Sequence, residues 1–255
     1  MKYFRTIYTV WLREMRRFWR DRSRLIGNLA MPFMFLAFLG VGFNSSFSIP
    51  GLEGGYIGYL APGIIGMSLM FTAIFTGISV IFDKQFGFLR EMLVAPASRW
   101  SIVGGKILGS STITLISGFM ILGIALLMGA IPLSAITVGN ILLAMVIMVL
   151  TAFIFVSIGL IIASKMNSME GFNLIMSFLI MPLFLLSGAF FPIENVPGWM
   201  QVLAGADPLK YGVDGLRSVL IGVGELPVAM NVLVLFAISA VMVLIASLLF
   251  RKMEA

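Results

Sequence analysis

The sequence predicts an all-α fold, a polytopic membrane protein with six transmembrane helices, and two observations support this prediction. First, 60% of the 255 residues are hydrophobic, only 11% are charged, and the mean hydropathy is +1.08. These values lie far outside the range of soluble domains. Second, the apolar residues gather in six uncharged segments of about 20 residues or more, the length that a helix needs to cross a bilayer core about 30 Å thick. We therefore expect a single transmembrane domain over residues 1–255.

Residues 1–24 predict an amphipathic helix that lies in the lipid headgroup region. They are rich in arginine, and their apolar residues recur at the helical spacing i, i+3, i+4, i+7: Phe4, Ile7, Tyr8, Trp11, Leu12, Met15, Phe18 and Trp19. We expect the aromatic face toward the membrane and the arginine face toward water. A cleaved secretory signal is the alternative, but the segment is too long and too amphipathic, and no clear small-residue cleavage site follows it.

Six uncharged segments are the predicted spans: Leu25–Phe43, Ile57–Phe82, Ile107–Gly129, Gly139–Ser164, Gly171–Phe191 and Val228–Phe250. The third and fourth belong to one long run without charge, which must fold back once. Gly129, Pro132, Ser134 and Gly139 predict the turn.

The distribution of Lys and Arg predicts the orientation. If both termini are cytoplasmic, all but two of the 17 basic residues lie on the cytoplasmic side, and only Lys210 and Arg217 lie outside. This asymmetry is the positive-inside pattern. We expect a multi-pass protein of the plasma membrane.

The polar island of residues 83–106 is the principal candidate for function. It carries Asp83, Lys84, Arg90, Glu91, Arg99 and Lys106. Because each charge costs about 2.5 to 3.5 kcal/mol near a bilayer centre, we expect all of them in water. The segment also carries apolar side chains suited to binding another surface: Phe86, Phe88, Leu89, Met92 and Leu93. Pro96 ends any helix after Val94 or Ala95. The pattern predicts either a short docking helix for a soluble partner or an interfacial loop without one.

Residues 187–226 predict an outer re-entrant or interfacial helical hairpin. The first helix covers Trp199–Ala204 and ends at Gly205. The second begins at Asp207-Pro208 and has Leu209, Val213, Leu216 and Leu220 on one face. Neither is long or apolar enough to span, and we expect Trp199 and Tyr211 at headgroup level.

Several functional classes are disfavoured by composition. The chain has no Cys and no His, so we expect no metal site and no thiol nucleophile. Its net charge of +6 lies beside apolar spans, which indicates contact with membrane lipids rather than nucleic acid. The expected spans hold no acid of the kind a secondary transporter uses, and no filter-like repeat indicates a channel. Asp207, Asp214 and Glu225 are the only concentration of acids on the outer side, and helix caps or solvated faces explain them.

Three stretches resemble one family, the type-2 permeases of ATP-binding-cassette exporters, close to the daunorubicin-resistance and multidrug branch. YIGYLAPGIIGMSL at Tyr56–Leu69 is similar to its Y-x-x-Y-L-x-P-G motif, and DKQFGFLREMLVAPASR at Asp83–Arg99 resembles its cytosolic coupling segment. Ser187–Arg217 resembles its pattern S-G-x-x-F-P, P-L-x-Y and an acid before L-R. Phe88 departs from the family, in which many members have Thr.

The resemblance implies a half-transporter that pairs with a second copy of itself or a related permease. It also implies a separate ATPase subunit that holds ATP and Mg²⁺, with no cofactor in this chain. The sequence itself contains no G-x-x-x-x-G-K-[ST] phosphate loop. The expected function is ATP-driven export of a lipophilic or amphipathic substrate, drug-like or lipid-like; a secondary transporter or a channel is the alternative.

Two residue sets are candidates for this function. Contacts to the ATPase are expected from Asp83, Phe86, Gly87, Phe88, Leu89, Arg90, Glu91, Met92, Pro96 and Arg99. The resemblance places the second and fifth spans at the dimer axis, where Phe71, Phe75, Phe178, Met181 and Phe184 are candidates for the substrate pathway. Ordinary packing or lipid contact is the alternative for each of these five. Gly63, Gly66, Ser117 and Gly118 are expected to allow close helix approach.

Overall fold

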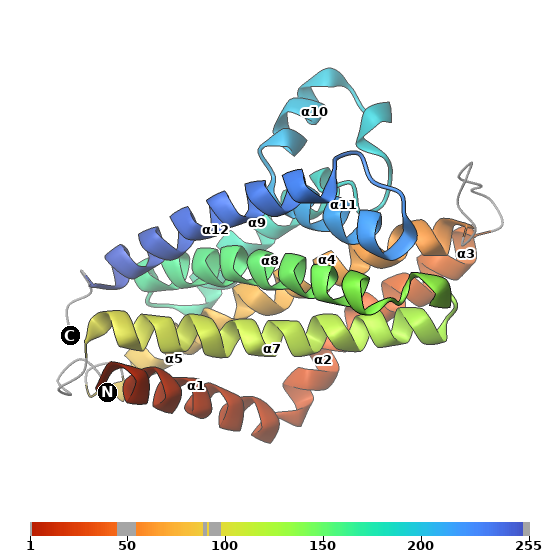
Figure 1. Cartoon of the computed structure of the whole chain (residues 1–255). Helices are drawn as coiled ribbons and strands as arrows, with labels where there is room; N and C mark the ends of the chain where they lie inside the picture. The colour runs from red at the N-terminus through yellow and green to blue at the C-terminus, as the bar shows by residue number, and fades with distance from the viewer. Residues whose placement is uncertain (1, 45–54, 89–90, 92–97, 252–255) are drawn as a thin grey trace.

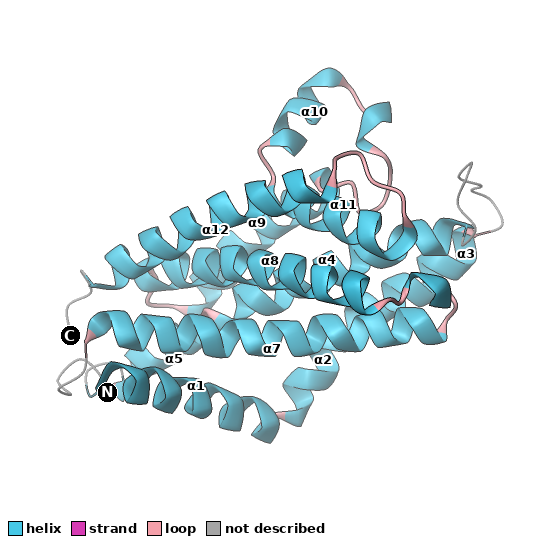
Figure 2. Ribbon diagram, viewed as in Figure 1, coloured by secondary structure: helices cyan, strands magenta, loops and turns pink. Residues whose placement is uncertain are grey.

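The computed structural model describes residues 2–44, 55–88, 91 and 98–251, and nearly all of them are helical (Figure 1). No β-strand occurs in this part of the chain (Figure 2). The first half comprises α1 (Lys2–Arg20), α2 (Arg22–Met34), the π-helical turn η1 (Phe35–Gly40), α3 (Val41–Phe43), α4 (Gly55–Thr76), α5 (Ile78–Gln85) and α7 (Arg99–Leu127). The second half comprises η2 (Leu133–Ala135), α8 (Val138–Lys165), α9 (Met169–Leu186), η3 (Ile193–Asn195), α10 (Gly198–Gly205), α11 (Pro208–Ile221) and α12 (Val228–Arg251).

The structure confirms six helical stretches long and apolar enough to cross a membrane: Ile26–Phe43, Gly55–Gln85, Arg99–Leu127, Val138–Lys165, Met169–Leu186 and Val228–Phe250. The third begins earlier than predicted, because the Ser98 side chain accepts a hydrogen bond from the Ser101 amide and caps the helix there. The fifth ends at Leu186, and Gly188 follows with a φ of 74° that favours glycine.

The second span lies in the centre of the bundle. α4 contacts α7, α8 and α11, and 83% of the span's most apolar window is buried. Small residues make this packing possible: a Cβ on Gly66 would lie 2.7 Å from Val213 of α11, and one on Gly118 of α7 would lie 2.7 Å from Leu69. These contacts confirm the expectation that Gly66 and Gly118 allow close helix approach.

The fifth span lies at the periphery. Only one stripe of α9 is buried, namely Phe172, Met176, Ile180 and Phe184. The other faces of α9 remain open, and Pro182 lies within the helix.

α11, the second helix of the predicted outer hairpin, is not a surface helix. The face of α11 with Leu209, Val213, Leu216 and Leu220 is buried, and α11 lies against α4, α8 and α12. α10 behaves as expected, ending at Gly205 with Trp199 exposed, and it projects from the bundle (Figure 1). The hairpin is therefore buried within the bundle at α11 and exposed at α10.

The first helix packs along α7 rather than standing apart. Val10, Met15 and Phe18 of α1 are buried, and Trp11 Nε1 donates a hydrogen bond to Thr112 Oγ1 at 3.1 Å. The prediction of an amphipathic helix is confirmed, but part of its apolar face is covered by protein. The opposite part, with Phe4, Tyr8 and Trp19, remains exposed and available to lipid.

Candidate functional site

The described parts of the polar island lie where α1 begins and α12 ends, which we call the terminal end (Figure 1). α5 stops at Gln85, and Gly87 follows with a φ of 76°, the left-handed conformation common just beyond a helix. The Glu91 amide donates to the Gly87 carbonyl at 3.3 Å, and α7 starts at Arg99. Six of the ten predicted contact positions fall within the described residues: Asp83, Phe86, Gly87, Phe88, Glu91 and Arg99. Leu89, Arg90, Met92 and Pro96, with the predicted helix stop, lie outside the described residues.

The expectation that every charge of the island lies in water is wrong for Asp83 and Lys106. Both are buried, and Lys106 Nζ lies 2.6 Å from Asp83 Oδ2. Lys106 Nζ is also 3.4 Å from Glu14 Oε1, and Arg13 Nη2 lies 2.6 Å from Asp83 Oδ1. Arg13, Glu14, Asp83 and Lys106 form what we call the charge cluster. Because its two acids and two bases neutralise one another, the cluster avoids the cost of an isolated buried charge.

The charge cluster joins three elements that are distant in sequence. Arg13 and Glu14 come from α1, Asp83 from α5 and Lys106 from α7. Burial disfavours the charged form of Arg13, but its hydrogen bond to Asp83 and the negative charges of Asp83 and Glu14 outweigh this and raise the pKa of Arg13. Both ends of the polar island are consequently fixed to each other and to the first helix.

Lys84 connects α5 to a fourth helix. Its ammonium donates to the carbonyl oxygens of Ala163, Ser164 and Met166, at 3.2, 2.6 and 3.1 Å, and so caps the end of α8. A positive charge is favourable at a helix C-terminus, where carbonyl groups lack intrahelical partners. The end of the second span is therefore held by α1, α7 and α8 together.

Two aromatic side chains lie outside the buried charge cluster. Phe86 is 73% exposed and stacks on Phe82 with 6.0 Å between ring centroids. Phe88 is 49% exposed, and the Arg13 guanidinium lies 4.8 Å from its ring centroid. A pocket of about 520 Å³ lies between these rings and α1. An exposed aromatic pair on a rigid base is suited to contact with another protein.

The five predicted pathway residues differ in how far they are exposed. Phe71 and Phe75 are half-buried and contact each other with 6.2 Å between centroids. With Ile78 and Phe82, they follow i, i+4, i+7, i+11 spacing and form the only partly open stripe on the second span between residues 71 and 82. Phe178 and Met181 on α9 are exposed, whereas Phe184 is 2% exposed. Phe184 packs between Phe35 and Phe190 in the core.

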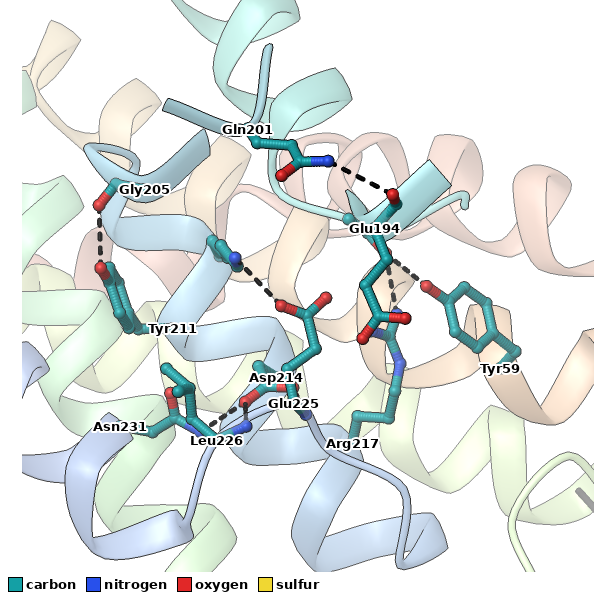
Figure 3. A network of polar contacts seen from close by, with 12 residues as sticks. Tyr59, Glu194, Gln201, Gly205, Tyr211, Asp214, Arg217, Glu225, Leu226 and Asn231 are labelled. Atoms are coloured by element: carbon teal, nitrogen blue, oxygen red, sulfur yellow. Dashed lines mark hydrogen bonds and ion pairs between the residues drawn. The ribbon is translucent and has the colours of Figure 1, made fainter. Parts of the chain in front are cut away.

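At the other end of the bundle, a second polar network includes Tyr59 and Arg217 (Figure 3), and both of these side chains contact the carbonyl oxygen of Gly188. Arg217 Nη2 donates to this oxygen at 2.9 Å and the Tyr59 hydroxyl donates to it at 3.1 Å. The Arg217 guanidinium also lies 3.8 Å from the Tyr59 ring centroid. A Cβ on Gly63 would lie 2.7 Å from the Ala189 carbonyl oxygen, so glycine is needed for α4 to approach this turn.

The outer acids serve as structural acceptors. Asp207 caps α11 by accepting from the Leu209 amide at 2.8 Å, as expected of a helix cap. Asp214 is buried rather than solvated, and it accepts from the amides of Glu225 and Leu226 and from Asn231 Nδ2. Among the described residues, no group of three acids could hold a metal ion.

Comparison with known proteins identifies the family. Residues 5–221 match the family described as ABC-2 type transporter. This chain belongs to that family. It is 28% identical over 250 residues to nodulation protein J of Rhizobium leguminosarum bv. viciae, covering 95% of this chain and 94% of that protein. It is 27% identical over 243 residues to the inner membrane transport permease YadH of Escherichia coli K12, covering 93% and 92%. It is also 28% identical over 197 residues to the putative transport permease ycf38 of Cyanophora paradoxa, covering 76% of this chain and 66% of that protein.

The fold brings together motifs that are far apart in the sequence of this ABC-2 permease. Tyr59 and Gly63 from the second span, Gly188 from the end of the fifth and Arg217 from α11 meet in one network. Parts of two separate family-like motifs thus lie in one structural unit. ABC-2 permeases generally pair with an ATPase subunit.

Sequence reasoning missed the partners of the polar island. Glu14 is the only acid of α1, on the same face as Val10 and Phe18, and Lys106 follows two glycines that lie close to α1. An acid within an apolar helical stripe and a base at the start of an uncharged run were the available signals. Neither indicates its partner without the three-dimensional arrangement.

Proposed function

We propose that this ABC-2 permease is the transmembrane subunit of an ATP-driven exporter for a lipophilic or amphipathic substrate. A separate ATPase subunit supplies the energy and holds ATP and Mg²⁺, and this chain binds no cofactor and is not itself an enzyme. A second copy or a related permease completes the pathway. In the plasma membrane, both termini and the terminal end face the cytoplasm, as the positive-inside pattern predicts.

One observation carries this proposal: exposed Phe86 and Phe88 stand on a base fixed by buried ionic contacts. The Asp83–Lys106 ion pair joins the end of the second span to the start of the third. Displacement of the exposed rings by a partner would therefore move both spans rather than deform a loop. ATP-driven closure of the ATPase subunits would tilt these spans and open the pathway outward.

The test uses Phe86→Asp in the permease, co-expressed with its ATPase subunit. We expect loss of copurification with the ATPase and loss of transport into inverted vesicles, because a charge replaces an aromatic contact. The matched control is Leu133→Asp, which changes an exposed apolar residue of η2, at the other end of the third span. Normal transport by Phe86→Asp would refute the docking role.

For the substrate pathway, the half-buried pair on the second span is the best-placed candidate. Phe71 and Phe75 have open edges on an otherwise buried helix, and exposed Phe178 and Met181 could face them across a dimer axis. Phe184 supports this surface from the core rather than lining it. Phe75→Ala combined with Phe178→Ala should change the profile of exported compounds; an unchanged profile and rate would dismiss these positions.

A secondary transporter is the second candidate, because Glu14 and Asp83 are buried ionisable groups at one membrane boundary. Such groups are typical of proton relays. Purified permease in sealed vesicles distinguishes the two functions. Uptake driven by a pH gradient without ATPase or ATP would establish the secondary transporter and overturn the exporter.

A further inference from the structure

The charge cluster uses only Arg13 of the arginine face of α1. Arg13, Arg16, Arg17 and Arg20 recur at i, i+3, i+4, i+7 and line one pocket of about 670 Å³, with Asp21 at its edge. Like charges at these spacings repel each other on a helix surface. Arg13 is paired with Asp83, and Asp21 is the one acid among the described residues that line the pocket, so the other three guanidinium groups need further negative charge.

Within the described residues, that charge is not supplied by the protein for three of the arginines. Arg13 is bound to Asp83, whereas Arg16, Arg17 and Arg20 make no ion pair. Arg17 instead lies 5.3 Å from the ring centroid of Phe82. Planar guanidinium groups bind the oxygen atoms of a phosphate in a bidentate manner, so these arginines have the chemistry of a phosphate site.

The position of α1 indicates where the phosphate comes from. Met15 and Phe18 of α1 pack against Ile113 of α7, with Ile116 beside them. Ile113 lies seven residues beyond Lys106, the last charge of α7, which is about 10 Å along the axis at 1.5 Å per residue. α1 therefore packs beside the uncharged part of a membrane span, and in a bilayer its arginines would be within reach of lipid headgroups. Trp19, which is 61% exposed, is an aromatic residue of the kind enriched at this level.

We propose that Arg16, Arg17 and Arg20, with Arg13 at the edge, bind the phosphate group of an anionic phospholipid in the leaflet beside α1. This inference does not depend on the exporter function. The bound lipid neutralises the arginine face and, because Arg13 belongs to both the pocket and the charge cluster, it contacts the base of the polar island. An acidic protein could take the place of the lipid only if its surface reached the depth of the lipid headgroups.

The experiment measures lipid binding to the purified full-length permease by native mass spectrometry. Phosphatidylglycerol should bind more tightly than phosphatidylcholine, and Arg16→Gln/Arg17→Gln/Arg20→Gln should weaken its binding about tenfold or more, because three charge-assisted contacts are lost. The control is Arg5→Gln, an exposed arginine of the same helix outside the pocket, which should bind as the unchanged protein does. The single variant Arg17→Gln should show a smaller loss and serves if the triple variant does not fold.

Each contrary result would give the arginines of α1 a different role. Equal binding of phosphatidylglycerol by the triple variant and the unchanged protein would overturn the proposal. If that variant instead lost copurification with the ATPase, the cluster would be a protein-docking surface. Displacement of phosphatidylglycerol by millimolar inorganic phosphate would overturn the lipid assignment and indicate a site for free phosphate.

Discussion

The two ends of the bundle hold their central buried charges, Asp83 and Arg217, by different means. At the terminal end, Asp83 lies between two cations, Arg13 and Lys106, and the contacts are made between side chains. At the opposite end, Arg217 is buried without an ion pair among the described residues, and it donates to the backbone oxygen of Gly188. Asp207 has one backbone donor, and its Oδ2 atom has no hydrogen-bond partner.

This difference indicates different mechanical roles. Ion pairs between side chains can transmit displacement between α1, α5 and α7, since each charge holds the other even when the backbone shifts. Contacts to a fixed carbonyl depend on the local backbone turn, so they specify one geometry of that turn. We infer that the terminal end is built to move as a unit and the opposite end to keep its shape.

Lys106→Met tests the first half of this comparison and has the largest expected effect. It leaves Glu14 buried without its cation and Asp83 with Arg13 alone. Removal of one partner from a buried ion pair costs about 3 to 5 kcal/mol. Thermal unfolding of the purified protein in detergent should show the loss.

The double variant Asp83→Asn/Lys106→Met separates the cost of an unpaired buried charge from the loss of the link between α5 and α7. With both charges removed, part of the stability should return, because Asp83 no longer needs a second cation, whereas Glu14 still lacks Lys106. Transport should stay impaired, since the link between α5 and α7 is gone. A stable and fully active double variant would contradict the transmitting role of the pair.

Asp207 gives the corresponding test at the opposite end, through pH. Burial raises its pKa to about 7, and the hydrogen bond from Leu209 opposes this only in part. A carboxyl with a raised pKa in the folded state stabilises the fold below its unfolded pKa near 3.9, and this contribution is lost as the pH rises to about 7. At about 1.4 kcal/mol per unit, the loss is up to roughly 4 kcal/mol.

Asp207→Asn keeps a capping side chain and removes the titration. The unchanged protein should lose stability relative to this variant between pH 4 and pH 7, measured as unfolding temperature at several pH values. The sequence has no histidine, so few other groups titrate in the upper part of this window. Parallel pH profiles for both proteins would show that Asp207 is not the titrating group.

The same comparison shows what the sequence could predict. Hydrophobic length and charge patterning predicted the six spans, α1, α10 and the cap at Asp207, because these depend on local composition and neighbouring residues. They failed at Asp83 and Lys106, where the cost of burying one charge depends on Glu14 and Arg13, which lie some 70 to 90 positions away. They predicted the start of α11 and its apolar face, but not that α4, α8 and α12 enclose this short helix.

Gly63→Ala tests whether the opposite end keeps its shape through close backbone packing. The added Cβ would lie 2.7 Å from the Ala189 oxygen and 2.8 Å from its Cα, and backbone atoms cannot move aside as a side chain does. Overpacking of this kind costs about 1 to 3 kcal/mol. Gly123→Ala on α7, with nothing within 4 Å of the new Cβ, should be neutral or stabilising. Equal unfolding temperatures for the two variants would remove this contact as a determinant.

Tyr59→Phe is the smallest change and refines the comparison most closely. It removes one hydrogen bond to Gly188, but Arg217 still donates to the same oxygen, and the ring under the guanidinium is kept. The expected loss is about 0.5 to 1.5 kcal/mol, toward the lower limit because no acceptor is left unsatisfied. Tyr59→Leu should cost more, since it also removes the cation–π contact, worth on the order of 2 kcal/mol in a desolvated site. If Tyr59→Phe were as damaging as Lys106→Met, the opposite end would depend on side-chain donors as strongly as the terminal end does, and the distinction between a moving and a fixed end would fail.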